Sequence, residues 1–318
     1  MESGICGEKQ KFGVDRLKNS TNDSRTNHDK TQASLVKKLS HSQEHHRMYP
    51  HHTQQIVFSP TGTTRKVLQS VLKGLSPQSW SGLDLTHLQA ALDPARNEHD
   101  SEGLALIGVP VYAGRVPTLA RDRMLGVDGN GRKAVLVVVY GNRAFDDALL
   151  ELRDLSLERG FVPVAAAAFV GEHSFSTKEC PIAEGRPDQS DLNRAVEFGQ
   201  SVQKKLREIA ELALDEASLQ VPGNFPYREG VQATPISPET DPDKCVLCGA
   251  CIEACPANAI SLCDDTLETN TMLCLRCCAC TRICPTGARA MLHPRILELG
   301  RVLHVKHAQR REPEFFLL

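Results

Sequence analysis

Residues 56–75 read IVFSPTGTTRKVLQSVLKGL: a short apolar run, a loop of small hydroxylated residues, and then apolar residues at helical spacing. The run at 56–58 predicts a buried strand. The helix that should follow carries one apolar stripe, made of Val67, Leu68, Val71, Leu72 and Leu75. A strand that passes directly into a helix is the building unit of a parallel sheet covered by helices.

The chain beyond residue 75 continues this alternation of strand and helix. Four further apolar runs predict strands at 83–86, 104–109, 134–139 and 162–170. A long amphipathic helix over 190–214 should close the unit. Because the apolar runs are continuous rather than alternating, the strands should be buried on both faces. Five such strands predict an α/β fold with a flavodoxin-like, doubly wound, five-stranded parallel sheet.

Composition limits the class of protein. The 318 residues exceed the usual size of one domain, 41% of them are hydrophobic, and the formal net charge is −2. This charge gives no sign of a nucleic-acid partner. No apolar run approaches the roughly 20 residues that span a bilayer, and the N-terminus lacks a hydrophobic signal region. We therefore expect a cytoplasmic protein without a membrane span.

The composition changes several times along the chain and predicts five segments. The first is a polar extension that we expect to be disordered and to which we assign no function, because it holds few apolar residues. Five prolines between residues 218 and 243 indicate a semi-rigid linker. The segments are an extension at 1–52, the flavodoxin-like domain at 53–217, the linker at 218–243, a cysteine-rich domain at 244–293, and a tail at 294–318.

The twelve cysteines are concentrated in an internal repeat. The spacing Cys-x2-Cys-x2-Cys-x3-Cys-Pro begins at Cys245 and again 29 residues later at Cys274. Three closely spaced thiolates hold one [4Fe–4S] cluster, and the cysteine before each proline reaches the other cluster. The sequence therefore predicts a small α+β domain with two [4Fe–4S] clusters. Their ligands would be Cys245, Cys248, Cys251 and Cys284 for the first, and Cys255, Cys274, Cys277 and Cys280 for the second.

A pair of zinc sites is the alternative for these cysteines. Zinc usually takes two Cys-x2-Cys pairs separated by a longer loop, which the triple spacing here does not match. Cys278 stands between predicted ligands, but the register of the repeat argues against its being one. Together with Cys6, Cys180 and Cys263 it is expected to be an ordinary thiol.

The loop between the first strand and helix predicts a phosphate site. At a helix N-terminus the backbone N–H groups and the helix dipole attract an anion. Gly62 would let the backbone approach closely, and four hydroxyl groups add donors. The alternative is a simple helix cap. The residues predicted to contact phosphate are Ser59, Thr61, Gly62, Thr63 and Thr64.

Two later loops predict a site for a planar ring. They follow the third and fourth strands, where ligands bind in doubly wound sheets. Tyr112 and Tyr140 offer aromatic faces, while Ala113, Gly114 and Gly141 leave room for backbone contacts. The alternative is that both tyrosines only pack these loops. Phe175 is a weaker candidate for the same neighbourhood.

The SxTGxT loop, the segments PVYAGRVP and VYGNR, and the paired cysteine motifs together resemble the flavodoxin–ferredoxin fusion proteins of bacteria and archaea. The resemblance covers about residues 53–293. It implies one FMN and two [4Fe–4S] clusters used in electron transfer. The phosphate would lie on the SxTGxT loop, and the ring would be bordered by Tyr112, Gly114, Tyr140, Gly141 and Asn142. Arg289 departs from the internal repeat, since Ile260 stands at the matching position.

Three functions remain open. The first is an electron relay between one-electron and two-electron redox protein partners, with no catalytic residue. The second is a flavin-dependent oxidoreductase that reduces a small molecule such as a quinone. The residues that would orient such a substrate are Arg115, Asn142, Arg143 and His173. The third, a redox or iron sensor, lacks an accompanying DNA-binding motif.

Overall fold

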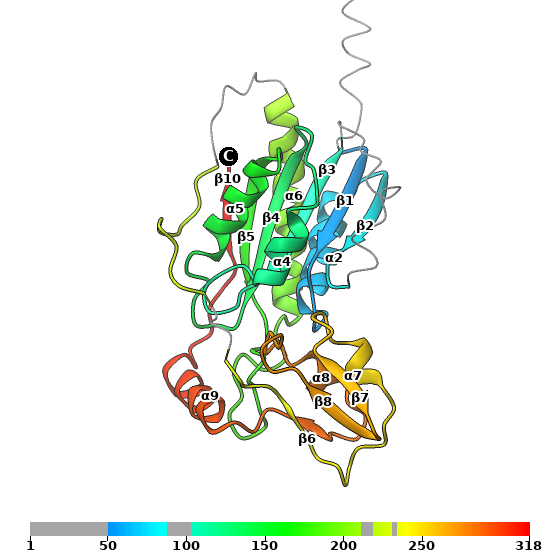
Figure 1. The fold of residues 1–318 in the computed structure, drawn as a ribbon. Helices are drawn as coiled ribbons and strands as arrows, with labels where there is room; N and C mark the ends of the chain where they lie inside the picture. The colour runs from blue at the N-terminus through cyan, green and yellow to red at the C-terminus, as the bar shows by residue number, and fades with distance from the viewer. Residues whose placement is uncertain (1–49, 88–102, 211–218, 231–233) are drawn as a thin grey trace, which may run out of the picture. The chain divides into compact units, whose positions relative to one another are not determined.

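The computed structural model describes residues 50–87, 103–210, 219–230 and 234–318 (Figure 1). The chain divides into two units, residues 1–47 and 48–318, and only the second belongs to the described part. The expected extension at 1–52 therefore lies almost wholly outside the described residues.

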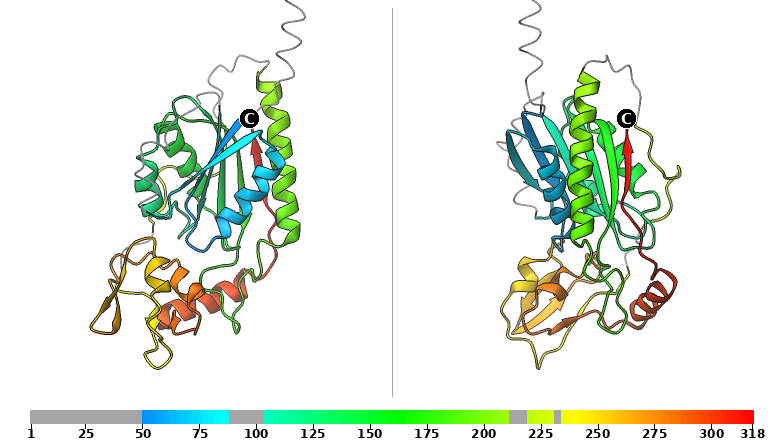
Figure 2. Two further views of the ribbon diagram at one scale, coloured as in Figure 1. Left: turned by 90° about the vertical axis from the view of Figure 1, so that its right-hand side faces the viewer. Right: turned by 180° about the vertical axis from the view of Figure 1, so that it is seen from behind.

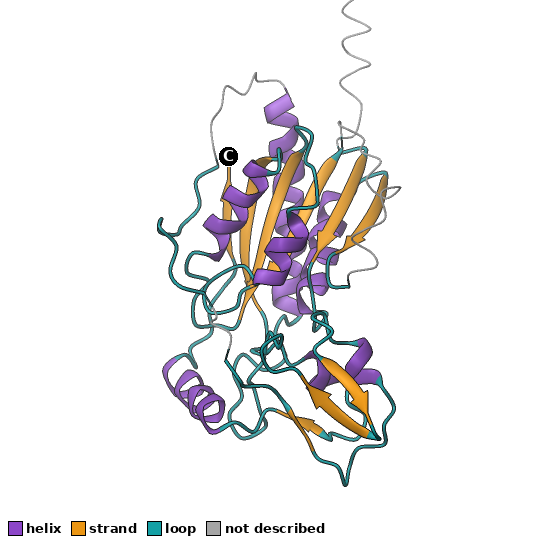
Figure 3. Ribbon diagram, in the orientation of Figure 1, coloured by secondary structure: helices purple, strands orange, loops and turns teal. Residues whose placement is uncertain are grey.

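A six-stranded sheet with the order β10-β5-β4-β3-β1-β2 forms the core of the described chain (Figure 3). Its five parallel strands are β1 (His52–Val57), β2 (Ser79–Asp84), β3 (Leu104–Pro110), β4 (Lys133–Tyr140) and β5 (Val162–Val170). The parallel order 2-1-3-4-5 is that of the flavodoxin-like doubly wound fold, as predicted. The second strand begins and ends earlier than its predicted range of 83–86.

Helices cover both faces of this sheet. The helices α2 (Thr63–Leu75) and α6 (Gln189–Ala210) pack on each other and on one face (Figure 2). They approach closely because Gly74 and Gly199 stand at the crossing, where a Cβ on Gly74 would lie 2.0 Å from the Val196 carbonyl oxygen. The helices α4 (Thr118–Met124) and α5 (Ala148–Glu158) cover the other face.

The segment at 294–318 is part of the fold, so the expectation of a simple tail was wrong. It forms α9 (Pro294–Lys306) and β10 (Glu314–Leu317). Strand β10 pairs antiparallel with β5, from Glu314 opposite Ala168 to Leu317 opposite Ala165. Its Phe315 stacks on Phe198 of α6, with ring centroids 4.9 Å apart. A sixth strand, absent from the prediction, thus covers the edge that β5 would otherwise expose.

The proline-rich segment is attached to the sheet domain rather than free. The Asp147 carboxylate at the start of α5 accepts hydrogen bonds from the backbone N–H groups of Asn224 and Arg228. The Tyr227 hydroxyl donates to Asp154, and the Arg115 guanidinium lies 4.8 Å from the Tyr227 ring centre. These contacts hold residues 224–228 against α5.

The cysteine-rich part is a small α+β unit with internal symmetry. Two short helices, α7 (Ala250–Glu253) and α8 (Ala279–Ile283), begin 29 residues apart, in register with the sequence repeat. Strand β6 (Glu239–Thr240) pairs with β9 (Arg289–Ala290), and β7 (Ile260–Cys263) pairs with β8 (Thr266–Thr269). Because β6 falls within the expected linker at 218–243, this unit begins earlier than predicted.

We expect Phe315→Ala to destabilise the fold by about 2 kcal/mol, because it removes a half-buried ring from the contact with α6 and β5; full burial would give roughly twice this loss. Leu317→Ala on the same strand is the matched control, since that side chain is exposed. Thermal unfolding followed by circular dichroism checks both variants. Equal midpoints for the two would contradict the packing of β10 on the sheet.

Candidate functional site

The loop after β1 is held in one conformation by its own hydrogen bonds. The backbone N–H of Ser59 donates to the Thr86 hydroxyl over 2.8 Å, and that of Gly62 donates to the Ser59 carbonyl. The Ser59 hydroxyl accepts from the Arg65 N–H in the first turn of α2. Gly62 adopts a left-handed conformation with φ of 77°, which glycine tolerates best. These bonds fix the conformation in which the loop passes from β1 into α2.

An anion at this loop would meet hydroxyl and backbone N–H groups, since the nearby cations are engaged elsewhere. The Arg65 guanidinium pairs with Asp84 at 2.5 Å, and the Lys66 ammonium donates to the Pro187 carbonyl. The hydroxyls of Thr61 and Thr63 lie 3.1 Å apart, with no protein atom within 4 Å of a Cβ built on Gly62. This chemistry suits a phosphate group held by the start of a helix.

The same loop lines a cavity of about 440 Å³, which we call the loop cavity. It lies at the carboxyl ends of β1, β3, β4 and β5, where ligands bind in this fold. Most of the predicted cofactor residues line it: Ser59, Thr61, Thr63, Thr64, Tyr112, Ala113, Gly114, Tyr140 and Gly141. The structure therefore brings together loops that are far apart in the sequence.

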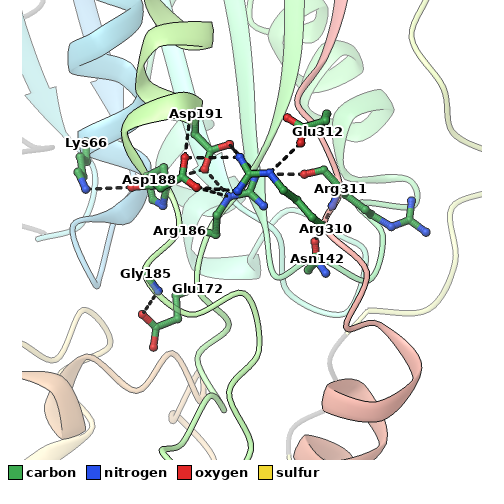
Figure 4. A network of polar contacts seen from close by, with 11 residues as sticks. Lys66, Asn142, Glu172, Gly185, Arg186, Asp188, Asp191, Arg310, Arg311 and Glu312 are labelled. Carbon is green, nitrogen blue, oxygen red and sulfur yellow. Dashed lines mark hydrogen bonds and ion pairs between the residues drawn. The ribbon is translucent and has the colours of Figure 1, made fainter.

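Asn142 takes a different place from the one predicted beside a ring. Its side-chain amide donates to the carbonyls of His307 and Gln309 at 2.6 and 2.9 Å. Its side-chain oxygen accepts from the Arg311 N–H (Figure 4). Asn142 is 3% exposed, so these bonds satisfy a buried amide. It holds the segment between α9 and β10 to the end of β4.

An ion-pair network fixes the same C-terminal segment (Figure 4). The buried carboxylate of Asp191 forms a bidentate pair with Arg186, and Arg310 approaches both Asp188 and Asp191. The hydrogen bond from Arg310 lowers the pKa of the Asp188 carboxyl. A bidentate pair that excludes water is stronger than a single exposed ion pair.

The two predicted tyrosines differ in what they offer to a ligand. The Tyr140 ring is 2% exposed and packs edge-on against Phe145, so most of its surface is already covered. Tyr112 is only half-buried and lies in a tight turn, in which Ala113 and Gly114 both have positive φ. Burial, together with the nearby Cys277 and Cys278 thiols, raises the pKa of Tyr112 well above its usual value. Tyr112 is therefore close to both the loop cavity and the cysteines.

Of the four residues expected to orient a small substrate, two are engaged elsewhere. Arg115 makes a bidentate ion pair with Glu151, both contacts being 2.7 Å, and Asn142 holds the C-terminal segment. Arg143 lines the loop cavity but pairs with Asp146. His173 also lines the cavity and packs against Gly141, where a Cβ would lie 2.2 Å from its ring.

His173 is a neutral group in this site. Burial is the main cause that lowers the pKa of His173 to about 4, and the cations Arg282 and Arg143 add to it. Its ring centre lies 5.1 Å from that of Phe175, so the two rings form one aromatic wall of the loop cavity. A neutral imidazole presents a hydrogen-bonding edge without a positive charge.

The sequence analysis missed one wall of the loop cavity. Ile296, Leu299 and Leu303 of α9 line it, and Leu275 and Arg276 from the second cysteine repeat do so too. The spacing of the three α9 residues places them on one helix face, and this pattern could have been recognised in the sequence.

The cysteines line two further cavities. Each cavity is lined by one of the two groups of four cysteines that the repeat predicts to lie together. The first cysteine cavity is lined by Cys245, Cys248, Cys251 and Cys284. The second cysteine cavity is lined by Cys255, Cys274, Cys277 and Cys280, with Cys278 beside them. Within the described ranges, no group of three or more acidic, histidine or cysteine side chains is close enough to hold a single metal ion.

The loops around the cysteines follow the repeat in their backbone conformation. Leu247 and Gly249 have positive φ, and so do Arg276 and Cys278, which are their counterparts 29 residues later. Cys278 thus occupies the left-handed position before α8 that Gly249 occupies before α7. Its thiol donates to the Arg276 carbonyl over 3.7 Å. This contact gives Cys278 a structural place in the turn.

The donor set fits an iron–sulfur group. Backbone N–H groups of Ala259 and Arg276 donate to the sulfurs of Cys255 and Cys274 at 3.3 and 3.4 Å. Burial raises the pKa of Cys277 and of Cys280. Buried thiols in such numbers become thiolates only when a metal compensates their charge. N–H···S hydrogen bonds of this kind are a usual feature of cluster sites.

Comparisons with known proteins give the class of each part. Residues 238–261 match the family model of the 4Fe–4S binding domain, so the C-terminal part contains a ferredoxin-type domain. No curated protein matches the chain. Together with the parallel strand order, these findings describe a flavodoxin-like α/β protein with a ferredoxin-type 4Fe–4S domain, a combination that belongs to redox electron transfer.

Solved structures similar to the chain include several flavodoxins. One from the domain Archaea has 10% identity and a TM-score of 0.36, with 49% of this chain and 99% of that chain covered. The flavodoxin of Fusobacterium nucleatum bound to flavin mononucleotide has 12% identity, a TM-score of 0.33, and coverage of 50% and 98%. The rubredoxin oxygen:oxidoreductase of Desulfovibrio gigas has 10% identity and a TM-score of 0.35, with 58% of this chain and 42% of that chain covered. The fold assignment rests on the strand order of the sheet.

As to membranes, the helices within the described residues all fall short of the length and apolar character that crossing a bilayer requires.

We expect the low pKa of His173 to make stability depend on pH. The unfolded chain binds a proton at this side chain near pH 6.5, and the folded chain only near pH 4, so stability should fall as the pH drops through this interval. His173→Gln should reduce this dependence. Unfolding midpoints of both proteins between pH 4 and 7 give the measurement, and parallel curves would contradict a neutral, buried His173.

Proposed function

We propose that the protein is an electron relay that holds one FMN and two [4Fe–4S] clusters, as the resemblance to flavodoxin–ferredoxin fusion proteins implies. The loop cavity would hold FMN, with its phosphate at the loop of residues 59–64. Each cysteine cavity would hold one cluster, ligated by the four cysteines that define it. The domain boundaries of this proposal are 50–210 together with 314–317 for the flavin domain and 238–293 for the cluster domain.

The observation that carries the proposal is that the three cavities are neighbours with shared walls. Leu275 lines both the loop cavity and the second cysteine cavity. Arg289 lines both the second and the first cysteine cavities. The proposed order is therefore FMN, then the cluster of Cys255, Cys274, Cys277 and Cys280, then the cluster of Cys245, Cys248, Cys251 and Cys284. Electron exchange between neighbouring groups needs no moving part in this arrangement.

The exposure of the cysteines gives the relay a direction. Each cysteine cavity has buried cysteines, Cys251 in the first and Cys277 and Cys280 in the second, but only the first has an exposed one, Cys248. The two residues before Cys248 in the sequence are apolar and exposed, Val246 to 63% and Leu247 to 40%. A redox protein partner would exchange electrons at this end.

Each residue around these groups has a defined task. FMN, when bound, would supply the exchange between two-electron and one-electron chemistry. The loop hydroxyls and the start of α2 would bind the phosphate. Tyr112 and the aromatic wall of His173 and Phe175 would border the ring, and apolar side chains of α9 would cover it. No side chain is required to abstract a proton from a substrate, and the neutral His173 is suited to orient the ring by a hydrogen bond.

The first test is the cofactor content of the anaerobically purified protein. We expect about one FMN with about eight iron and eight acid-labile sulfide per chain. Gly62→Glu should lose FMN and keep iron, because it adds a side chain and a negative charge where the phosphate would lie. Gly131→Glu is the matched control, since Gly131 has nearly the same φ and open surroundings. Iron without flavin in the native protein would contradict the assignment of the loop cavity.

The order of the centres is tested by removing one cluster at a time. Cys251→Ala should lose about half of the iron and still allow the remaining cluster to be reduced when FMN is photoreduced. Cys277→Ala should also lose half of the iron but should break the exchange with FMN. Electron paramagnetic resonance after photoreduction distinguishes the two variants. Equal reduction of the remaining cluster in both would contradict the proposed order.

Turnover assays on the purified protein distinguish a relay from a small-molecule reductase. Turnover with dithionite and a panel of quinones should be slow and indifferent to the acceptor for a relay. Saturable turnover with one acceptor, abolished by Gly62→Glu, would instead support the oxidoreductase.

A further inference from the structure

Arg289 is a buried cation at the boundary between the two cysteine cavities. Its side chain is 4% exposed and lines both of them. The matching position in the first half of the repeat is Ile260, which is buried and apolar. The two halves of the repeat therefore differ at this position, where the first has an aliphatic side chain and the second a cation.

The contacts of Arg289 go to hydroxyl and thiol groups rather than to a carboxylate. Its guanidinium donates to the Thr240 hydroxyl at 2.6 Å, to the Thr269 hydroxyl at 3.1 Å and to the Cys280 sulfur at 3.8 Å. Its Nε is buried and has no hydrogen-bond partner within the described chain. A guanidinium buried in this way is unfavourable unless negative charge lies close to it.

The cysteine sets supply that negative charge once they carry iron and sulfide. Four thiolates around a [4Fe–4S] core leave a net negative charge, which grows by one when the cluster accepts an electron. Arg289 reaches a cysteine of each set: its side chain donates to Cys280, and its backbone N–H is hydrogen-bonded to Cys284. The two hydroxyls of Thr240 on β6 and Thr269 on β8 hold the guanidinium in place between the sets.

We propose that Arg289 is a shared counter-cation that raises the reduction potentials of both clusters. This inference rests on the proposed function. A cation in a low-dielectric interior stabilises the reduced cluster more than the oxidised one, because the reduced cluster carries more negative charge. One electron enters each cluster from the reductant, and no bond is made or broken. The effect is greater at the second cluster, whose Cys280 receives the side-chain hydrogen bond.

The test is a redox titration of each cluster, monitored by electron paramagnetic resonance, in the full chain with both cofactors. Arg289→Ile introduces the residue of the matching position and should shift both midpoints to more negative values. A tenfold fall in the ratio of reduced to oxidised cluster at a fixed ambient potential corresponds to a shift of 59 mV for one electron. Arg289→Lys keeps the charge and should keep most of the native potential.

Two controls separate this effect from a purely structural role. Arg301→Gln removes the same charge from an exposed position on α9 and should leave both midpoints unchanged. Thr269→Val removes one anchor of the guanidinium but no charge, so it should lower thermal stability and shift the potentials less than Arg289→Ile does. A structural tie alone would instead affect stability in both variants and the potentials in neither.

The outcomes are distinguishable from failure of the relay itself. Native protein without iron would contradict the proposed function. Native protein with two clusters whose midpoints do not change in Arg289→Ile would overturn the role of Arg289 and leave the relay intact. If Arg289→Ile loses its iron, the clusters of Arg289→Gln and Arg289→Lys are compared instead. Midpoint potentials that are lower in the Gln variant than in the Lys variant support the inference, and equal midpoint potentials overturn it.

Discussion

The architecture depends on the antiparallel pairing of β10 with β5. The chain leaves the sheet after α6, forms the cysteine-rich unit and α9, and returns to the same sheet four residues before its end. The cysteine-rich unit is therefore attached to the α/β domain at both ends. Asn142 and the Arg310 ion pairs fix the returning segment, and residues 224–228 fix the outgoing one. With both ends held, α9 and Leu275 stay against the loop cavity, which a single linker would not ensure.

Charge is distributed differently at the two kinds of site. The loop that would bind phosphate uses hydroxyls and a helix start, while its neighbouring cations are paired with Asp84 and the Pro187 carbonyl. The cysteine unit does the reverse and buries the Arg289 guanidinium, which contacts two threonine hydroxyls and the Cys280 sulfur. A flavin bound beside a neutral loop and clusters bound beside a buried cation would have different reduction potentials, because the charges around them differ.

The features that the sequence predicted correctly are local. Continuous apolar runs identify the parallel strands, and the cysteine spacing identifies which four cysteines lie together, because both patterns are imposed by neighbouring residues. The pairing of β10 could not be predicted, since four residues with the sequence EFFL do not indicate their partner strand. Asn142 was misplaced for a related reason: its loop position was right, but its side chain is directed by carbonyls 165 and 167 residues away. The apolar stripe of α9, in contrast, has the helical spacing that a sequence alone can indicate.

The walls of the loop cavity bear on the choice between relay and reductase. An acceptor molecule would need to reach the ring of a bound flavin past Ile296, Leu299 and Leu303 of α9, while Leu275 occupies the side facing the cysteines. Two of the polar residues that would have oriented such a molecule, Arg115 and Asn142, are already bound to other protein groups. The second cysteine cavity adjoins the loop cavity through Leu275. In the proposed relay, electrons would pass between the flavin and the clusters at this shared wall.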